Sequence, residues 1–365
     1  MSRTIDSVSF PLDLGDFDEI VDVRSPGEFA EDHISGAINL PVLSDEERTE
    51  VGTIYKQVSA FEARKIGAAL VSANIGRHLE NHFRDKPKDY RPLVYCWRGG
   101  QRSGSLATVL SDVGWNSSLL NGGYKAYRAE VVATIERCAS ESSLVVLNGY
   151  TGAGKTLVLK ALRELGAQVL DLEGMANHKG SVFGGDPDTP QPAQKRFESL
   201  IYDELRFFDP EKITFVEAES AKIGRLNLPN PLWQKMKAAP VIEIASSLEE
   251  RARYLCDDYE DWLGDVDRIE QTLDRLVGFH SHEKIEQWKE RTRKGEWLNF
   301  TEELLRDHYD QRYTVEGTGN YSAPVDRVDL PHHDESTVRG VARVTWDKAL
   351  SLTDDCPASA GTSEP

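Results

Sequence analysis

The amino-acid sequence predicts an α/β protein with two successive parallel-sheet domains followed by a helical extension. In the first 245 residues, short apolar runs alternate with longer stretches of helical periodicity. This alternation is typical of parallel strands joined by helical crossovers. After Ser246 the sequence becomes strongly charged and helical in period to about Arg312. A chain of 365 residues is long enough for two to three domains, so each segment can build its own core.

In the first segment, residues 1–140, apolar runs at 20–23, 93–96 and 117–121 predict strands, and Ser59–Ile75 and Ser103–Val113 predict helices. The second segment, residues 141–245, begins with a buried-strand pattern at 144–149, a glycine-rich turn and a helix to about Leu165. Further strands are expected at 168–172, 213–217 and 241–245. Residues 246–350 form the predicted helical extension, with Ser246 or Ser247 as N-cap, and residues 351–365 a disordered polar tail.

Composition narrows the class of protein. Hydrophobic residues make up 39% and charged residues 28% of the chain, which is typical of a folded soluble protein. The sequence holds no apolar run long enough to span a membrane and no signal-peptide pattern, so we expect a cytoplasmic protein without membrane contact, and a monomer. Its cysteines are too widely spaced for a disulfide framework or a zinc site; they are Cys96, Cys138, Cys256 and, in the tail, Cys356.

The net charge of −18 opposes a general attraction to nucleic acid, but the charge is unevenly distributed. Residues 84–137 hold nine basic and five acidic side chains, whereas residues 241–365 hold 15 basic and 28 acidic ones. A polyanion can therefore still dock on the N-terminal and central parts of the chain.

The first chemical centre is a cysteine in an anion-binding turn. Cys96 ends an apolar strand and precedes a glycine-containing loop and a helix that starts at about Ser103. Convergent backbone N–H groups, the helix N-terminus and the guanidinium groups of Arg98 and Arg102 all favour thiolate over thiol. We therefore expect the pKa of Cys96 to lie below the free value of about 8.5, which makes it a nucleophile. The alternative is a buried structural cysteine. The remaining loop residues are Trp97, Gly99, Gly100, Gln101 and Ser103.

The segments DVRSPGEFAEDHISGAINLP (22–41), CWRGGQRS (96–103) and LLNGGYKAYR (119–128) together resemble a rhodanese domain. The resemblance implies that Cys96 carries a transferable chalcogen. The loop is one residue longer than the common single-domain rhodanese pattern, and its spacing of Cys, five residues, Arg is also that of protein tyrosine phosphatases. A phosphatase therefore remains an alternative, although Tyr95 stands where those enzymes usually have His. The longer loop would also suit a tetrahedral selenophosphate group.

The second centre is a phosphate-binding loop. Residues 149–156, GYTGAGKT, match the P-loop pattern after an apolar strand and before a helix. Gly149, Gly152, Ala153 and Gly154 would present backbone N–H groups to phosphate, Lys155 would add a charge, and Thr156 would be a ligand of Mg²⁺ if this ion is used.

Four acidic residues near strand ends are candidates to support this loop, namely Asp171, Glu173, Glu217 and Glu219, and Glu217 is preferred. Residues 178–185, HKGSVFGG, offer Lys179 and Ser181 as a lid over the phosphates; a solvated turn is the alternative.

The order of the two centres, with the segments DLEGMANHKGSVFGG (171–185), QPAQKRFESL (191–200) and VEAESAKIG (216–224), resembles the tRNA 2-selenouridine synthase family over about residues 15 to 315. The fold expected from this resemblance is a rhodanese-like α/β domain followed by a P-loop NTPase-like parallel-sheet domain. The resemblance implies that selenium replaces sulfur at the wobble 2-thiouridine of tRNA, through an S-geranyl intermediate. The implied co-substrates are selenophosphate, delivered by a supplying enzyme, and geranyl diphosphate, with no tightly bound cofactor.

Such an enzyme must hold an RNA loop. Trp97 is a candidate to stack on an unstacked base. Basic residues that could contact tRNA phosphates are Lys125, Arg128, Lys195, Arg196, Lys222 and Arg225. Two other classes of function remain open from the residues alone. One is a P-loop kinase or ATPase with a sulfurtransferase or phosphatase domain, and the other is a noncatalytic tRNA-binding or redox-sensing protein.

Overall fold

The computed structural model describes residues 5–180, 184–185, 189–259, 265–312 and 321–354. The described chain forms two compact units. The first comprises residues 1–135 and 192–203, and the second comprises residues 136–191 and 204–365. Among the described residues, no helix is both long and apolar enough to cross a membrane.

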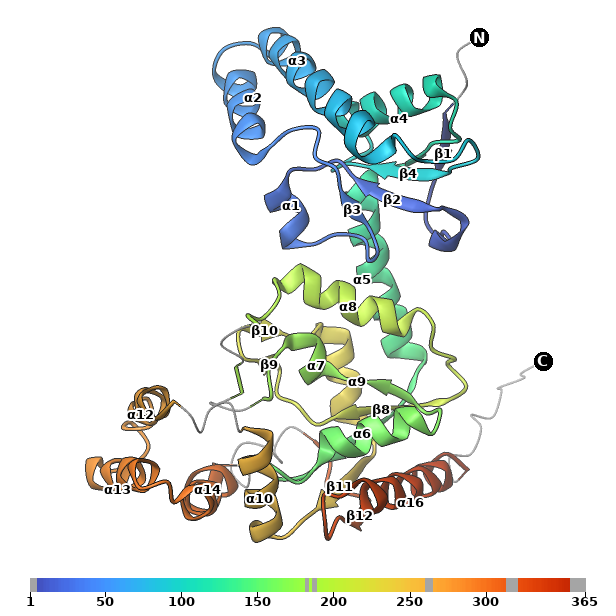
Figure 1. The fold of residues 1–365 in the computed structure, drawn as a ribbon. Helices are drawn as coiled ribbons and strands as arrows, with labels where there is room; N and C mark the ends of the chain where they lie inside the picture. Colours follow the sequence, from blue (N-terminus) through green and yellow to red (C-terminus); the bar gives the residue numbers. More distant parts are fainter. Residues whose placement is uncertain (1–4, 181–183, 186–188, 260–264, 313–320, 355–365) are drawn as a thin grey trace, which may run out of the picture. The chain divides into compact units, whose positions relative to one another are not determined.

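The first unit is built on a parallel five-stranded sheet of order β1-β5-β4-β2-β3 (Figure 1). The strands are β1 (Asp6–Val8), β2 (Glu19–Asp22), β3 (Ile38–Asn39), β4 (Pro92–Tyr95) and β5 (Ser118–Leu120). Val21, Val94, Leu106 and Leu110 are among the residues of its apolar core. Because β2, β4 and β5 are neighbouring parallel strands, their carboxyl ends meet at one edge of the sheet, where α/β proteins commonly bind ligands.

Helices surround this sheet. They are η1 (Leu14–Asp16), α1 (Pro26–Glu31), α2 (Asp45–Gln57), α3 (Ala60–His78), the π-helical η2 (Leu79–Phe83), α4 (Gln101–Val113) and the first part of α5 (Gly123–Glu141). Helices α2 and α3 pack side by side as a hairpin (Figure 1). Gly67 permits this packing, since a Cβ at this position would lie 3.3 Å from the Val51 side chain.

The second unit contains another parallel five-stranded sheet, of order β12-β11-β6-β8-β7. Its strands are β6 (Ser143–Asn148), β7 (Gln168–Leu170), β8 (Ile213–Glu217), β11 (Val241–Ala245) and β12 (Asp326–Asp329). Val145, Leu147, Phe215, Ile242 and Ile244 contribute to its core. A separate antiparallel pair is formed by β9 (Lys222–Ile223) and β10 (Leu226–Asn227).

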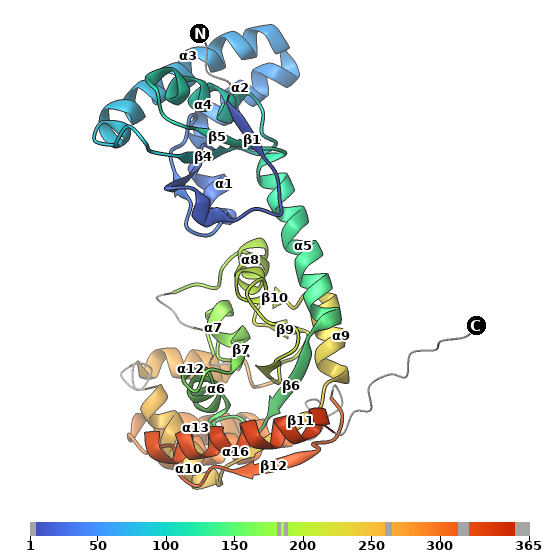
Figure 2. The ribbon, with the colours of Figure 1, turned by 90° about the vertical axis from the view of Figure 1, so that its right-hand side faces the viewer.

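Helices α6 (Lys155–Glu164), α7 (Leu172–Ala176) and α9 (Asn230–Ala238) connect these strands. The C-terminal helices are α10 (Leu248–Asp258), α12 (Val266–Asp274), α13 (His282–Arg293), α14 (Trp297–Leu304), η3 (Leu305–Tyr309), α15 (Asp310–Arg312) and α16 (Glu335–Asp354). Ser247 caps α10, because its side chain accepts a hydrogen bond from the Glu250 N–H group. Figure 2 shows α16 running beside α6 and β12, which it contacts.

The predicted α/β fold and its main strands are confirmed, but the grouping of residues differs from the predicted boundaries in two places. Helix α8 (Gln194–Leu205) falls within the second segment of the sequence, yet residues 192–203 belong to the first unit. The predicted helical extension also contains β12, which completes the second sheet, and α16 continues to Asp354 inside the predicted tail. Residues 355–365, with Cys356, lie outside the described residues.

Candidate functional site

Cys96 lies at the carboxyl edge of the first sheet, between the end of β4 and the start of α4. Its side chain is inside a tight loop, and the residue is 3% exposed. The Gly100 N–H group and the Ser103 hydroxyl donate hydrogen bonds to its Sγ atom, at 3.3 and 3.2 Å. Burial raises the pKa of the thiol, but hydrogen bonds from Ser103, Gly100 and Arg98 backbone or side-chain groups outweigh burial, so the net pKa is lowered. The expected direction of the shift is therefore confirmed.

The physical cause differs from the one expected, because hydrogen bonds, and not the guanidinium charges of the loop arginines, lower the pKa of Cys96. The Arg102 guanidinium pairs instead with the Glu28 carboxylate, at 2.7 and 3.4 Å. Arg98 and Gln101 are exposed, and Arg98 makes no ion pair with any residue that the structure describes. The N–H and O–H groups around Sγ thus stabilise the thiolate. A phosphatase would need Arg102 for the phosphate ester, and its pairing with Glu28 counts against that alternative.

Two glycines let neighbouring segments approach the cysteine loop closely. Gly99 has φ +67°, and a Cβ there would lie 2.8 Å from the Leu120 carbonyl oxygen. Gly123 has φ +57°, and a Cβ there would lie 2.2 Å from the Cys96 carbonyl oxygen. The Tyr124 N–H group can therefore donate to the Cys96 carbonyl oxygen at 2.8 Å. The segment after β5 thus fixes the cysteine loop from one side.

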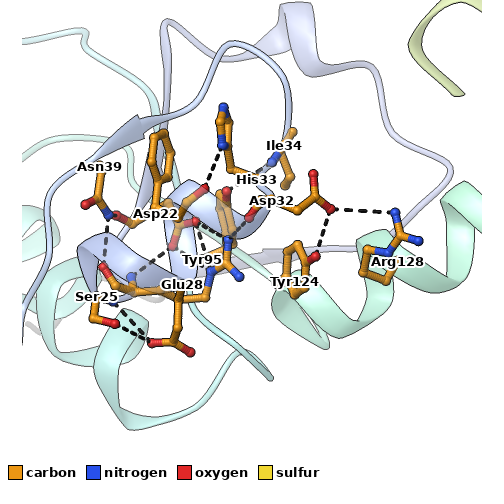
Figure 3. A network of polar contacts seen from close by, with 12 residues as sticks. Asp22, Ser25, Glu28, Asp32, His33, Ile34, Asn39, Tyr95, Tyr124 and Arg128 are labelled. Atoms are coloured by element: carbon orange, nitrogen blue, oxygen red, sulfur yellow. Dashed lines mark hydrogen bonds and ion pairs between the residues drawn. The ribbon is translucent and has the colours of Figure 1, made fainter. Parts of the chain in front are cut away.

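A buried polar network surrounds Tyr124, whose N–H group contacts this loop (Figure 3). Asp22 accepts hydrogen bonds from the Arg24 backbone and guanidinium, and both residues are almost fully buried. The Arg24 guanidinium carbon lies 3.9 Å from the centre of the Tyr124 ring, whose hydroxyl donates to the Asp32 carboxylate at 2.7 Å. This network gives the early Asp-Val-Arg segment a structural role. Asp22 and Arg24 hold Tyr124 in the position from which the Tyr124 N–H group supports the cysteine loop.

Helix α8 is tied to the same network. The Ser199 hydroxyl donates to the Asp32 carboxylate at 2.9 Å, and Arg128 pairs with both Asp32 and Glu198. Arg196 donates to the His33 carbonyl oxygen at 3.2 Å, and Lys195 pairs with Glu31 at 2.8 Å. Arg128, Lys195 and Arg196, expected as tRNA contacts, are thus engaged in holding α8 on the first unit.

The other proposed tRNA contacts are on the surface. Lys125 and Lys222 are exposed and make no ion pair with any residue that the structure describes. The Arg225 side chain is exposed and donates to the Gln191 carbonyl oxygen. Trp97 is half-buried beside Tyr124, with ring centres 5.3 Å apart. Among the described residues, the Lys125 and Lys222 ammonium groups form no ion pair. These two lysines, and the half-buried Trp97, therefore remain candidates for contacts with tRNA.

The phosphate-binding loop joins β6 to α6 in the second unit, as the sequence predicts. Gly149, Gly152 and Gly154 have φ values of +153°, +79° and +84°, which other residues rarely adopt. Ala153 is buried within the turn, at 1% exposure. The Lys155 ammonium donates to the Gly149 carbonyl oxygen at 2.7 Å, so the lysine lies folded over the loop.

Three of the four predicted acids gather beside this loop. The Thr156 hydroxyl donates to the Glu173 carboxylate at 3.3 Å, and the Glu173 N–H group donates to Glu217 at 2.7 Å. Glu173 and Glu219 both approach Gly180, where a Cβ would lie 2.7 and 2.8 Å from their carboxylate oxygens. Asp171 instead caps α7, since it accepts a hydrogen bond from the Gly174 N–H group.

Burial sets the protonation of this acidic group. Burial, with repulsion from Glu173 and Asp171, raises the pKa of Glu217 to about 8. Burial and the Glu173 charge also raise the pKa of Glu219 well above its usual range. Oε2 of Glu217 is buried and accepts no hydrogen bond from the residues that the structure describes. Glu217 and Glu219 are therefore more easily protonated than exposed carboxyl groups, and Glu217 has an oxygen atom available to a ligand.

In the predicted lid, Lys179 pairs with Asp258 at 2.6 Å and lies 4.3 Å from the centre of the Tyr259 ring. Ser181 lies outside the described residues.

Sequence reasoning missed three residues that surround the phosphate-binding loop. Arg251, on α10, is buried, donates to the Thr151 carbonyl oxygen at 3.1 Å and pairs with Asp310 at 2.7 Å. Tyr254 stacks on His333, with ring centres 4.7 Å apart. Arg251 and Tyr254 are on α10, the helix after β11, and His333 follows β12. Residues that follow strands of a parallel sheet are candidates for a site at its carboxyl edge, and this position could have identified Arg251 and Tyr254. His333 could not be found in this way, because β12 was not predicted.

Comparison with known families gives two matches in this chain. Residues 6–130 match the rhodanese-like domain, and residues 142–284 match the tRNA 2-selenouridine synthase AAA domain. The first match contains Cys96 and its supporting network. The second contains the phosphate-binding loop and the three gathered acids.

Several known proteins are similar to this chain over most of its length. The chain is 35% identical over 264 residues to the tRNA 2-selenouridine synthase of Nitrosomonas europaea, covering 71% of this chain and 68% of that protein. It is 38% identical to the protein of the same name from a Sulfurovum species, covering 66% of this chain and 65% of that protein. The protein of this name from Psychromonas ingrahamii is 32% identical, with 80% of this chain and 86% of that protein covered. The chain thus spans about two thirds of the length of the first two relatives and most of the third.

Proposed function

The chain belongs to the tRNA 2-selenouridine synthase family, whose members are tRNA-modifying enzymes of the transferase type, and we propose that it replaces sulfur by selenium in tRNA. The proposed substrate is the wobble 2-thiouridine of the anticodon loop. The proposed co-substrates are geranyl diphosphate and selenophosphate, the latter from a supplying enzyme. Because tRNA is the substrate, the reaction is placed in the cytoplasm.

One observation carries the proposal: the Cys96 sulfur lies in a loop that favours its ionised form. A thiolate can act as a nucleophile at neutral pH, whereas a thiol is a poor one. The lowered pKa of Cys96 contrasts with Cys138 and Cys256, whose pKa values burial raises. Among these three cysteines, Cys96 is the one suited to act as the nucleophile toward selenophosphate.

In the first step, the thiouridine sulfur attacks C1 of geranyl diphosphate, a C–S bond forms, the C–O bond breaks and pyrophosphate leaves. Alkylation turns a poor leaving group into a neutral thiol. The P-loop supports this step, because its N–H groups and Lys155 can neutralise the charge that develops on the departing pyrophosphate.

In the second step, selenium from selenophosphate is delivered to the ring carbon at the Cys96 site. Geranylthiol leaves, and water takes up the phosphoryl group as phosphate. The overall exchange involves no net oxidation or reduction, because selenium and sulfur are in the same oxidation state. We propose that the Cys96 thiolate starts this exchange by attacking the phosphorus of selenophosphate. The S–P bond forms and the P–Se bond breaks, the released selenide attacks the ring carbon, and water then hydrolyses the S–P bond to regenerate the thiolate.

Mg²⁺ fits the chemistry of the second site. The Thr156 hydroxyl and the Glu173 and Glu217 carboxylates are oxygen donors, the ligand type that Mg²⁺ prefers. Within the described ranges, no group of three or more acidic, His or Cys side chains is arranged to hold a metal ion alone. Thr156 would therefore hold Mg²⁺ together with ligand phosphates and waters. Bound Mg²⁺ would offset diphosphate charge.

The test is a reconstituted reaction of the full chain with tRNA that contains 2-thiouridine, with each co-substrate supplied in turn. Mass spectrometry of the nucleosides should show S-geranyl-2-thiouridine with geranyl diphosphate alone, and 2-selenouridine when selenophosphate is added. The Cys96→Ser variant should lose at least 100-fold of selenium incorporation and keep its affinity for tRNA.

Cys138→Ser is the matched control and should retain activity, since Cys138 lies outside the loop and its pKa is raised. Normal selenium incorporation by the Cys96→Ser variant would refute the proposed role of this thiolate. Steady hydrolysis of ATP without tRNA, and no geranylation, would support the kinase or ATPase alternative instead.

A further inference from the structure

His333 lies directly against the phosphate-binding loop, although it is almost 180 residues away in the sequence. It follows β12, the edge strand of the second sheet. A Cβ at Gly154 would lie 2.9 and 3.0 Å from Cδ2 and Nε2 of His333. The imidazole therefore packs on the glycine that precedes Lys155, at a distance that only glycine allows.

The ring is held in a defined orientation. It stacks on Tyr254 of α10, with ring centres 4.7 Å apart and planes inclined by 12°. Glu250 and Tyr254 on α10, and His332 on its own segment, are the titratable groups near it. The neighbouring His332 is exposed and pairs with Glu250 at 3.4 Å.

Both ring nitrogens of His333 are buried, and neither has a hydrogen-bond partner among the residues that the structure describes. Burial lowers the pKa of His333, while Glu250 and the backbone of Gly152 and Ala153 oppose this effect. A neutral imidazole has one N–H donor and one acceptor, and leaving both unsatisfied in a buried position is unfavourable. The available donor lies beside a loop whose N–H groups bind phosphate.

We propose that His333 contacts the ligand of the P-loop, donating a hydrogen bond from its imidazole to an oxygen of a bound diphosphate group. The inference rests on the proposed function, in which this loop holds a diphosphate. It adds a specific ligand-binding residue outside the P-loop motif, in the segment that follows β12. The shared chemistry is a diphosphate group, whether it is attached to a geranyl chain or to a nucleoside.

The test measures binding of inorganic pyrophosphate to the full chain by calorimetry. The His333→Ala variant should bind about 10-fold more weakly, which corresponds to the loss of one hydrogen bond to a charged group. The His333→Asn variant keeps an N–H donor and should recover part of this loss. The His332→Ala variant is the matched control and should bind like the unmodified chain. Repeating the titration with geranyl diphosphate and with ATP distinguishes the source of the diphosphate.

Two outcomes separate this inference from the proposed function. Unchanged affinity in the His333→Ala variant, with binding lost in the Lys155→Ala variant, would overturn the role of His333 and leave the phosphate site intact. Unchanged affinity in the Lys155→Ala variant would refute the phosphate site itself. If the His333 variants fail to fold, ¹⁵N-histidine NMR of the unmodified chain tests the inference instead. Adding pyrophosphate should shift the resonances of a buried imidazole, and the absence of a shift would overturn the inference.

Discussion

At Cys96, burial and hydrogen bonding act on the same sulfur in opposite directions. Burial alone would make this thiol inert, as it does for structural cysteines. The donors in the loop reverse the outcome, since the Ser103 hydroxyl and the Gly100 N–H group both donate to Sγ. The reactivity of this residue therefore depends on hydrogen bonds from Ser103, Gly100 and the Arg98 backbone, and not on the positive charges of the loop.

The Ser103→Ala variant tests this cause. Loss of the hydroxyl donor should raise the pKa of Cys96 by about one unit, since a hydrogen bond to a charged group is worth about 1.5–3 kcal/mol. The rate of alkylation by iodoacetamide, measured from pH 6 to 10, should rise at a correspondingly higher pH than in the unmodified chain. At pH 7 it should be about 10-fold slower.

Ser105→Ala is the control for this experiment, because Ser105 lies on the same helix but donates to the Gln101 carbonyl oxygen. Its alkylation profile should match that of the unmodified chain. An unaltered profile in the Ser103→Ala variant would show that another group sets the pKa of the thiol.

The chemistry of Cys96 could be predicted from the sequence because strand, glycine turn and helix are adjacent along the chain. The role of Arg102 could not, since its partner Glu28 is 74 positions away. The same limit applies to His333, which meets Gly154 only after β12 joins the sheet. Local patterns identify the reactive group, whereas long-range contacts decide which neighbours act on it.

At the level of secondary-structure elements, the turn from β5 into the first residue of α5 sets the shape of the cysteine loop. The Gly123→Ala variant would place a methyl group 2.2 Å from the Cys96 carbonyl oxygen, so the loop must move. We expect this variant to lose at least 10-fold of selenium incorporation and to be destabilised by about 2 kcal/mol, from backbone strain and the clash. Thermal unfolding and the nucleoside assay measure the two effects.

Gly36→Ala separates strain from clash. Gly36 also has a positive φ, +81°, but a Cβ there would meet nothing within 4 Å. This variant should lose about 1 kcal/mol of stability and keep its activity. Equal activity of the two variants would show that the approach of Gly123 to Cys96 does not matter for function.

Helix α8 is an element whose sequence position and spatial position differ. Its charged side chains look like surface contacts in the sequence, yet Arg128 of α5 bridges Asp32 and Glu198. The Arg128→Ala variant leaves the buried Asp32 carboxylate without its cation, which should destabilise the docking of α8 by roughly 3 kcal/mol. Hydrogen exchange of peptides from α8 should become faster by about two orders of magnitude.

The Lys195→Ala variant provides the comparison, because the Lys195–Glu31 pair is largely exposed and such pairs contribute about 0–1 kcal/mol. Its α8 peptides should exchange at nearly the original rate. Similar acceleration in both variants would mean that Arg128 has no special part in holding α8.

At the scale of the whole molecule, both parallel sheets could be predicted because each core strand is a short apolar run between helices. Strand β12 was missed because its sequence, DRVD, has one apolar residue. The strand lies at the edge of the sheet and pairs only with β11. The placement of α8 was missed because the chain leaves the second unit at residue 192 and returns after 203. Apolar patterning identifies sheet interiors, but it does not reveal which unit a polar helix joins.

The division into two units predicts that the two proposed steps can be lost separately. The Lys155→Ala variant should leave 2-thiouridine unmodified, because the diphosphate site is impaired. The Cys96→Ser variant should accumulate S-geranyl-2-thiouridine, because its cysteine site is impaired while its phosphate-binding loop is intact. Each unit has its own sheet and core, so neither change should unfold the other unit.

A mixture of the two variants should then form 2-selenouridine, more slowly than the unmodified chain, since geranylated tRNA can pass from one molecule to the other. Mass spectrometry of the nucleosides over time follows all three forms, and a mixture of a variant with itself is the control. An inactive mixture, with both variants folded and binding tRNA, would show that a single molecule must carry out both steps.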